Sequence, residues 1–394
     1  MKNKIDLPVP EKCVGCGVCS FVCPRACLKM VPDALGFLYP RVSDGCVSCG
    51  KCVRYCPVLN PGKLAPIRKV FAGWSTRPAV RISAASGGVF SALAEKWLAD
   101  GGVVVGAAYD DRMRVRHVIC RDGKDLAALR GSKYVQSDLG EIFKESCRVI
   151  LEEKRPLLFC GTPCQCAALR ALCGDSEQLF LCDLICYGVG APEIFRRQID
   201  FLERRYGDRI IGWNMRDKRF GWQYPVHVAT FKCAGPRILR GRDDIYSSGY
   251  SRGLFMRESC YGCRFCTADR TGDLTLGDFW GLKDDAITRD DCRRGISLIA
   301  AISERGEKLL QDLIADGKLV CRQEEIAMAV SGNIALRKCA ESAAHGRFRE
   351  DMSSLSFPEL QTKYFHIPLW KALIKRFVPL RLQAYLAIRR KLKS

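Results

Sequence analysis

The cysteines are the residues whose number and spacing point most directly to chemistry. The chain of 394 residues holds 24 of them, and nine fall within the first 56 residues. The segments that begin at Cys13 and Cys46 both read C-x2-C-x2-C-x3-C-P. Thiolates bind iron, and the two-residue spacers allow three thiolates to hold one face of a four-iron cubane. An internal repeat with this spacing therefore predicts two iron–sulfur sites in the first 60 residues.

The same repeat resembles a bacterial-type ferredoxin, a small α+β domain that binds two 4Fe-4S clusters. In that arrangement the fourth cysteine of each half, which precedes proline, binds the other cluster. We therefore assign Cys13, Cys16, Cys19 and Cys56 to one cluster, and Cys46, Cys49, Cys52 and Cys23 to the other. A zinc ribbon needs only two C-x2-C pairs, so it leaves the third cysteine and the proline of each half unexplained. Cys27 fits no ligand position, and we expect it to be a buried thiol.

Composition and charge narrow the class of protein. Apolar residues make up 48% of the chain and charged residues 27%, which is typical of a globular protein. No stretch of 18 uncharged apolar residues and no apolar signal segment occur, so we expect a cytoplasmic protein in which metal binding is favoured over disulfides. The net charge of +20 favours acidic partners. Nucleic acid is not expected among them, because no helix-turn-helix, RRM or zinc-finger pattern accompanies the charge.

The rest of the chain predicts an α/β body behind this ferredoxin domain. Residues 61–70 read as a linker, since the stretch that contains them is rich in proline and has little periodicity. Short apolar runs predict buried strands, and one stretch that follows a Ser-Gly-Gly turn predicts a helix. The expected strands lie within residues 101–110, 155–161, 178–186 and 295–302, and the expected helix within residues 86–100.

Cysteines at predicted turns mark a further site in the body. Cys164 follows a strand and begins a helix, where the helix dipole is expected to lower the thiol pKa and favour a nucleophile or a metal ligand. Cys186 ends another strand, and Cys260 opens a C-x2-C-x2-C motif that lacks a fourth cysteine. An incomplete motif and two single cysteines at turns are together able to form one four-thiolate site.

An ordered set of motifs resembles one known family. SAASGGVFSAL, RGSKYVQSD, GTPCQ, ICYG, MRDKRFGW, CYGC and DLTLGDFWG follow one another between residues 71 and 302. This set is similar to the beta subunits of coenzyme F420 hydrogenase and dehydrogenase. F420 is a deazaflavin that carries hydride. With the ferredoxin domain in front, the chain resembles the electron-input subunit of reduced coenzyme F420 dehydrogenase. Other members are bacterial proteins often encoded near polysaccharide-synthesis genes, or reduce chlorophyll precursors.

The resemblance implies an iron–sulfur flavoprotein. It implies FAD and one 4Fe-4S cluster in the body, hence three clusters in all, with residues 71–150 forming the N-terminal, flavin-binding region and residues 151–335 the C-terminal region with the third cluster. The family's cluster ligands map to Cys164, Cys186, Cys260 and Cys263. Cys160, Cys166, Cys182 and Cys266 lie close by in the sequence, and any of them could replace one of those four. The family's flavin residues map to Ser86, Gly87, Gly88, Ser132, Lys133, Tyr134, Gln136 and Ser137. No catalytic side chain is identified.

Elementary chemistry gives these flavin assignments a reason. A Ser-Gly-Gly turn before a helix exposes backbone N–H groups to a pyrophosphate, although a simple helix cap has the same pattern. Lys133 could neutralise a phosphate or a reduced flavin, or could be a solvated charge. The absence of G-x-G-x-x-G argues against a Rossmann site. Residues 214–222, which contain Arg216, Lys218 and Arg219, are either a solvated basic loop or a clamp for the anionic tail of F420.

The sequence therefore predicts an oxidoreductase that moves electrons between a hydride carrier, FAD and the clusters. Two alternatives stay open: a reductase of another substrate in a polysaccharide or pigment pathway, and an electron relay with no substrate of its own. Its partner is a redox protein or the hydride carrier itself. Residues 336–394 form a helical basic tail, which either packs on the body or contacts an acidic partner or the inner face of the membrane.

Overall fold

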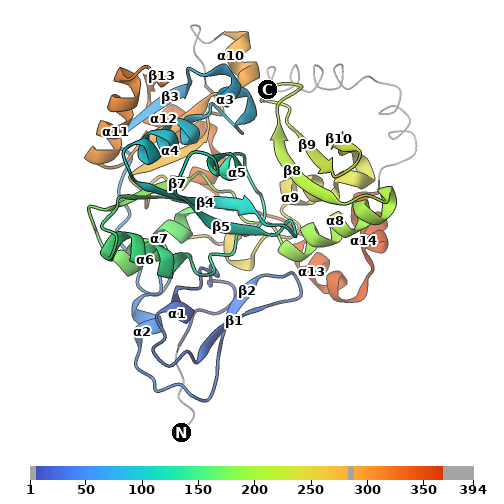
Figure 1. The fold of residues 1–394 in the computed structure, drawn as a ribbon. Coiled ribbons are helices and arrows are strands. Elements are labelled where there is room, and N and C mark those ends of the chain that lie inside the picture. Colours follow the sequence, from blue (N-terminus) through green and yellow to red (C-terminus); the bar gives the residue numbers. More distant parts are fainter. Residues whose placement is uncertain (1–5, 283–287, 367–394) are drawn as a thin grey trace.

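The computed structural model describes residues 6–282 and 288–366. The part of the basic tail from residue 367 onward lies outside these residues. Figure 1 shows an N-terminal part, a central sheet with helices on both faces, and a smaller sheet with its own helices. No helix in the described part of the chain is long and apolar enough to cross a membrane.

The N-terminal part is built on the cysteine repeat. Two single-turn helices, α1 (Val18–Phe21) and α2 (Lys51–Arg54), begin at equivalent places in the two halves. Each is preceded by a glycine in the left-handed region, Gly17 at φ 81° and Gly50 at φ 72°, a conformation that favours glycine. Strands β1 (Leu28–Pro32) and β2 (Leu38–Val42) form an antiparallel hairpin between them.

An eight-stranded mixed sheet forms the centre of the body, with the order β13-β3-β12-β11-β7-β6-β4-β5. Strands β4, β6, β7 and β11 run parallel, and the outer pairings are antiparallel. The four expected strands are confirmed as β4, β6, β7 and β12. Strands of this one sheet come from both regions that the sequence distinguishes, residues 71–150 and residues 151–335. The bounds are β3 Lys69–Ser75, β4 Val103–Tyr109, β5 Val115–Cys120, β6 Leu157–Gly161, β7 Leu179–Leu184, β11 Leu274–Asp278, β12 Ser297–Ala301 and β13 Leu319–Glu324.

Alternate residues of the sheet pack against helices on its two faces. Val104 and Leu158 face one apolar cluster with α4 (Val89–Ala99), α5 (Leu126–Leu129) and α11 (Glu304–Ala315). Val103 and Leu157 face the opposite cluster with α6 (Ile142–Leu151) and α7 (Pro163–Cys173). The second cluster also contains Val18 of α1, so the N-terminal part packs on this face (Figure 1). The helix expected within residues 86–100 is confirmed as α4.

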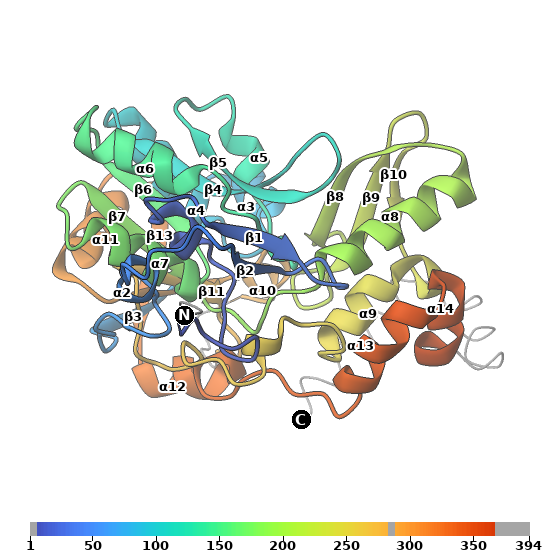
Figure 2. The ribbon, with the colours of Figure 1, turned by 90° about the horizontal axis from the view of Figure 1, so that it is seen from below.

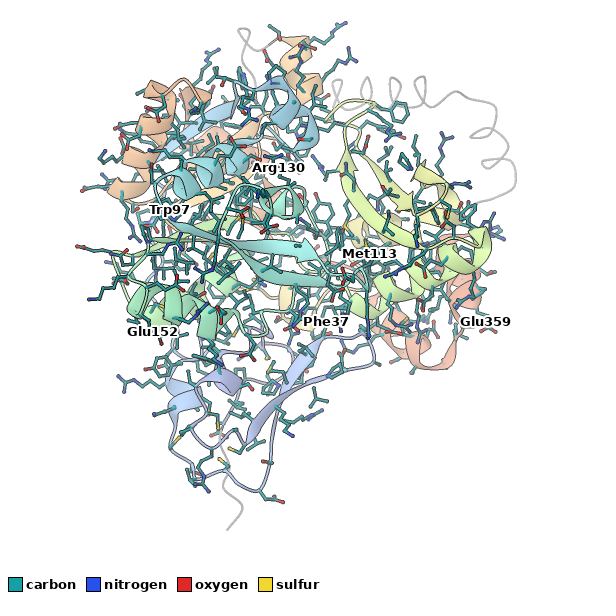
Figure 3. The ribbon with its side chains drawn as sticks, in the orientation of Figure 1. Phe37, Trp97, Met113, Arg130, Glu152 and Glu359 are labelled. Carbon is teal, nitrogen blue, oxygen red and sulfur yellow. The ribbon has the colours of Figure 1, made fainter. Side chains whose placement is uncertain are left out.

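A second, three-stranded antiparallel sheet stands beside the first (Figure 2). It consists of β8 (Ile210–Asp217), β9 (Val226–Phe231) and β10 (Gly235–Ile238). Its apolar cluster also contains Phe37 of the N-terminal hairpin, which Figure 3 places where the hairpin meets the body. Four helices pack on this unit: α8 Pro192–Tyr206, α9 Ile245–Ser251, α13 His345–Ser354 and α14 Phe357–Phe365. The shorter helices α3 (Pro78–Ser83), α10 (Arg289–Arg294) and α12 (Ile326–Gly332) lie near the other edge of the central sheet.

Candidate functional site

The N-terminal cysteines line two separate cavities. The lining of one includes Cys13, Cys16, Cys19 and Cys56; we call it the inner cavity. The lining of the other includes Cys23, Cys27, Cys46, Cys49 and Cys52; we call it the outer cavity. Cys27 is buried as expected, and its Sγ lies 3.3 Å from the Sγ of Cys23. Cys27 is thus a fifth thiol in the outer cavity, beside the four candidate ligands.

Cys164 occupies the second position of α7, as the sequence predicts. Thr162 caps the helix together with Gln165, and the Thr162 Oγ1 lies 3.1 Å from the Cys164 Sγ. The expected pKa shift is wrong, however. Burial raises the pKa of the Cys164 thiol, and this outweighs the hydrogen bond from Thr162 and the charge of Arg257, which both lower it. A helix N-terminus lowers a thiol pKa only where the side chain keeps enough solvation.

The four candidate ligands of the body come from the first turn of α7, from the segment after β7 and from the segment that contains Cys260 and Cys263. Burial raises the pKa of Cys186, and the nearby charges of Cys260, Cys164 and Cys263 raise it further. The structure therefore brings Cys164, Cys186, Cys260 and Cys263 within electrostatic range of one another. Burial likewise raises the pKa of Cys260 and of Cys263, each to about 12. A neutral thiol is the state that an apolar pocket favours until a cation binds it.

A small apolar cluster connects this group to the inner cavity. Val14, Ala167 and Phe265 form its buried centre, and Cys16, Cys164 and Cys263 pack against it. The body thiols and the first N-terminal thiols are thus neighbours across a few side chains.

The four alternative cysteines differ in their surroundings. Cys166 and Cys182 are fully buried in the apolar clusters on the two faces of the central sheet. Cys160 pairs with Cys182 across β6 and β7. The Cys266 Sγ donates a hydrogen bond to the Ala335 carbonyl at 3.2 Å. Among the described residues, no group of three or more His, Cys, Asp or Glu side chains is arranged to hold a metal ion.

The Ser-Gly-Gly turn precedes α4, but its donors are engaged within the protein. The Ser86 Oγ donates to the Ile296 carbonyl at 2.9 Å, and the Gly87 N–H donates to the Ser297 Oγ at 2.9 Å. A Cβ at position 87 would lie 2.4 Å from the Gly73 carbonyl oxygen, so close packing on β3 explains this glycine. Gly88, at φ 86°, caps the helix. The turn therefore does not present these two donors to a pyrophosphate.

The second predicted flavin segment divides into two environments. The Lys133 ammonium donates to the carbonyls of Ala128 and Arg130, both at 2.9 Å, and burial lowers its pKa to about 7. Tyr134 stacks on Tyr250 with ring centroids 4.8 Å apart, and Ser132, two residues before it, is half-buried.

The other two residues of the segment face elsewhere. Gln136 donates from Nε2 to the Val14 carbonyl at 3.1 Å, so it reaches the N-terminal part. Ser137 is buried, and its Oγ lies 2.7 Å from His117 Nδ1. The structure thus separates Lys133 and Tyr134 from Gln136 and Ser137.

An aromatic and charged group that the sequence only partly indicated lies at the end of β8. Arg216 is buried and pairs with Asp278 at 2.8 Å, and its guanidinium lies 5.5 Å from the centre of the Trp280 ring. Trp222 stacks on Trp280 with centroids 4.5 Å apart and donates from Nε1 to Asp278 at 2.7 Å. The Arg216 Nε is buried without a hydrogen-bond partner among the described residues.

This group adjoins both predicted flavin segments. Arg216 lies within electrostatic range of Tyr134, and the Lys218 ammonium donates to the Ser86 carbonyl at 2.7 Å. The interpretation of this segment as a solvated basic loop is therefore wrong for Arg216 and Lys218. Of the three basic residues, only Arg219 is exposed. Arg216 and Asp278 belong to the motifs MRDKRFGW and DLTLGDFWG, so the sequence could mark both residues. That the two form an ion pair is visible only in the folded structure.

His117 gives the stability of the sheet a predictable dependence on pH. It is buried, stacks on Phe159, and burial lowers its pKa to about 4. An unfolded histidine has a pKa of about 6.5, so between these values the unfolded chain binds a proton that the folded chain lacks. The free energy of unfolding should therefore fall by about 2 kcal/mol as the pH falls from 7 to 5. Denaturant unfolding at both pH values measures this, and His117→Gln should flatten the difference; an equally steep loss in the variant would contradict it.

Comparisons with known proteins identify the family. One family model, for the N-terminal part of the coenzyme F420 hydrogenase/dehydrogenase beta subunit, matches residues 70–144, and a second, for the C-terminal part of that subunit, matches residues 154–326. A chain of the F420-reducing NiFe hydrogenase complex from Methanosarcina barkeri is similar at 15% identity and TM-score 0.48, over 76% of this chain and 91% of that one. No curated protein matches. The two models together match well over half of the sequence, and the chain belongs to the coenzyme F420 hydrogenase/dehydrogenase beta subunit family.

Proposed function

We propose that this protein moves electrons between coenzyme F420, or a related hydride carrier, and a redox partner protein by means of FAD and three 4Fe-4S clusters. Its family makes it an oxidoreductase subunit that acts in electron transfer. The observation that carries the finer proposal is the grouping of cysteines. The inner and outer cavities divide eight of them into the two sets of four that the spacing predicts, with Cys27 added to one set.

The residues around each group suit a bound cluster. Thiols gather in largely apolar pockets, where unpaired thiolates would be unfavourable and a cluster's iron would compensate their charge. A 4Fe-4S cluster carries single electrons, and a flavin exchanges hydride for single electrons. The apolar cluster of Val14, Ala167 and Phe265 keeps water out of the space between the body thiols and Cys16.

A flavin fits best near Lys133, Tyr134 and Arg216. Lys133 is a half-buried amine with two carbonyl partners, and Arg216 has a buried N–H without a partner among the residues described. A bound anion would stabilise the charged form of the lysine and satisfy the arginine. The turn that contains Ser86, Gly87 and Gly88 would support this site through Lys218 rather than by its own donors.

Lys133→Ala should lower the amount of FAD that copurifies with the protein by about tenfold, because a phosphate or anionic ring would lose a half-buried cation. Acid release and chromatography of the cofactor measure this. Iron content should stay unchanged, because the candidate cluster ligands lie outside this segment. Lys144→Ala, on the surface of α6, is the matched control. FMN in place of FAD, or equal FAD in both variants, would contradict the prediction.

An anaerobic assay with reduced F420 and a viologen dye tests the function as a whole. We expect dye reduction that depends on both F420 and bound flavin. A protein with about twelve iron atoms but no flavin would instead be an electron relay. A flavin-loaded protein that reduces the dye only with another hydride donor would favour the reductase of a different substrate.

A further inference from the structure

Arg257 lies between the inner cavity and the body thiols. Its side chain is 1% exposed, and it precedes Cys260 by three residues. The guanidinium donates to the Cys13 carbonyl at 2.7 Å, to the Leu38 carbonyl at 3.0 Å and to the Gln136 Oε1 at 2.9 Å. Nη2 also lies 3.7 Å from the Cys13 Sγ. One arginine of the body thus holds the N-terminal part beside a candidate cluster ligand.

The pocket around this guanidinium is closely fitted. The Tyr39 and Phe37 rings have their centres 4.2 and 5.6 Å from the guanidinium carbon. A Cβ at Gly15 would lie 2.4 Å from Nη1, so the repeat leaves space for the charge only because glycine stands there. The position of the charge relative to Cys13 is therefore fixed.

The surroundings of this charge in the described part of the chain are polar but contain no carboxylate partner. Among the described residues, Arg257 forms no ion pair with an Asp or Glu, and its partners are carbonyls, an amide and a thiol. A buried cation without a countercharge is strongly unfavourable. A cluster held by four thiolates in the inner cavity would supply the missing negative charge.

Among the described residues that line the outer cavity, there is no buried arginine or lysine. The arginine that lines it, Arg25, is exposed to solvent. Water and salt screen an exposed charge, whereas a buried charge acts through a medium of low dielectric constant. The two cavities therefore present their clusters with different electrostatic surroundings.

We propose that Arg257 makes the cluster of the inner cavity easier to reduce than the cluster of the outer cavity. This inference rests on the proposed function, since it needs both clusters. Reduction adds one electron, and hence one negative charge, to a cluster whose potential depends on charge, hydrogen bonds to sulfur and exposure. A fixed guanidinium beside Cys13 stabilises that added charge. Arg257 thereby places the more easily reduced cluster next to the body.

An anaerobic redox titration followed by EPR tests this on the full-length, reconstituted chain, with dithionite supplying the electrons. Arg257→Met should lower the equilibrium constant for reducing one of the two N-terminal clusters about tenfold, which is about 59 mV for one electron. The other N-terminal cluster should keep its potential. Arg257→Lys keeps the charge without the fork of donors, and should recover part of the shift.

Two further variants keep the test decisive. Arg264→Met removes an exposed arginine that contacts Val58, a residue of the same cavity, and should leave both potentials unchanged. Gln136→Glu neutralises the guanidinium in place, and should shift the same potential as Arg257→Met even if that variant loses iron. Unchanged potentials in Gln136→Glu, with iron retained, would overturn the role of Arg257. Wild-type protein without N-terminal clusters would instead overturn the proposed function, and this inference with it.

Discussion

Cys260→Ser should lower the iron content of anaerobically purified protein from about twelve atoms per chain to about eight. Cys260 is half-buried, and Cys164, Cys186 and Cys263 lie within electrostatic range of it. A serine oxygen is a poorer ligand for cluster iron than a thiolate, so the body cluster should be lost while the two N-terminal clusters remain. Because cluster assembly is coupled to folding, the yield of folded protein should fall as well. Iron and acid-labile sulfide analysis measures the change.

Cys266→Ser is the matched control. Cys266 completes the same C-x2-C-x2-C motif, but its thiol donates to the Ala335 carbonyl. This variant should keep about twelve iron atoms per chain. If the iron content instead fell to about eight atoms in Cys266→Ser and did not fall in Cys260→Ser, Cys266 and not Cys260 would be the ligand. About eight iron atoms per chain in the wild type would show that the body holds no cluster.

Arg270→Met should lower the free energy of unfolding by about 3–5 kcal/mol. Arg270 and Asp183 form an ion pair at 2.7 Å, and both side chains are almost wholly buried. Asp183 also accepts hydrogen bonds from the Thr275 hydroxyl and the Gly272 N–H. Removing the arginine would leave a buried carboxylate without its countercharge, which is the costly change. Anaerobic denaturant unfolding followed by circular dichroism measures the difference.

The control for this prediction is Arg294→Met. Arg294 pairs with Asp290 at 2.7 Å, but both side chains are largely exposed. An exposed pair of this kind contributes at most about 1 kcal/mol. Equal destabilisation by the two variants would show that burial of the Asp183 pair is not the reason for its effect.

The sequence alone predicted much of the local structure and the grouping of the N-terminal cysteines around two cavities. Spacing fixes which thiols can share one cluster, because three ligands within seven residues must lie close together whatever the rest of the chain does. Apolar runs located β4, β6, β7 and β12, since a strand buried on both faces is apolar throughout. The turn before α4 was predicted from its Ser-Gly-Gly sequence for the same local reason.

The tertiary structure decided the contacts between distant segments. The pKa of Cys164 is set by burial and not by its helix position, so the sequence expectation had the wrong sign. Gly87 owes its identity to the backbone of β3, which lies fourteen residues away in the sequence at Gly73. The pairing of Arg216 with Asp278, and of Arg257 with Cys13, joins residues that no spacing rule connects. Burial and long-range pairing depend on how the sheets and the N-terminal part pack together, and periodicity along one segment contains no information about that packing.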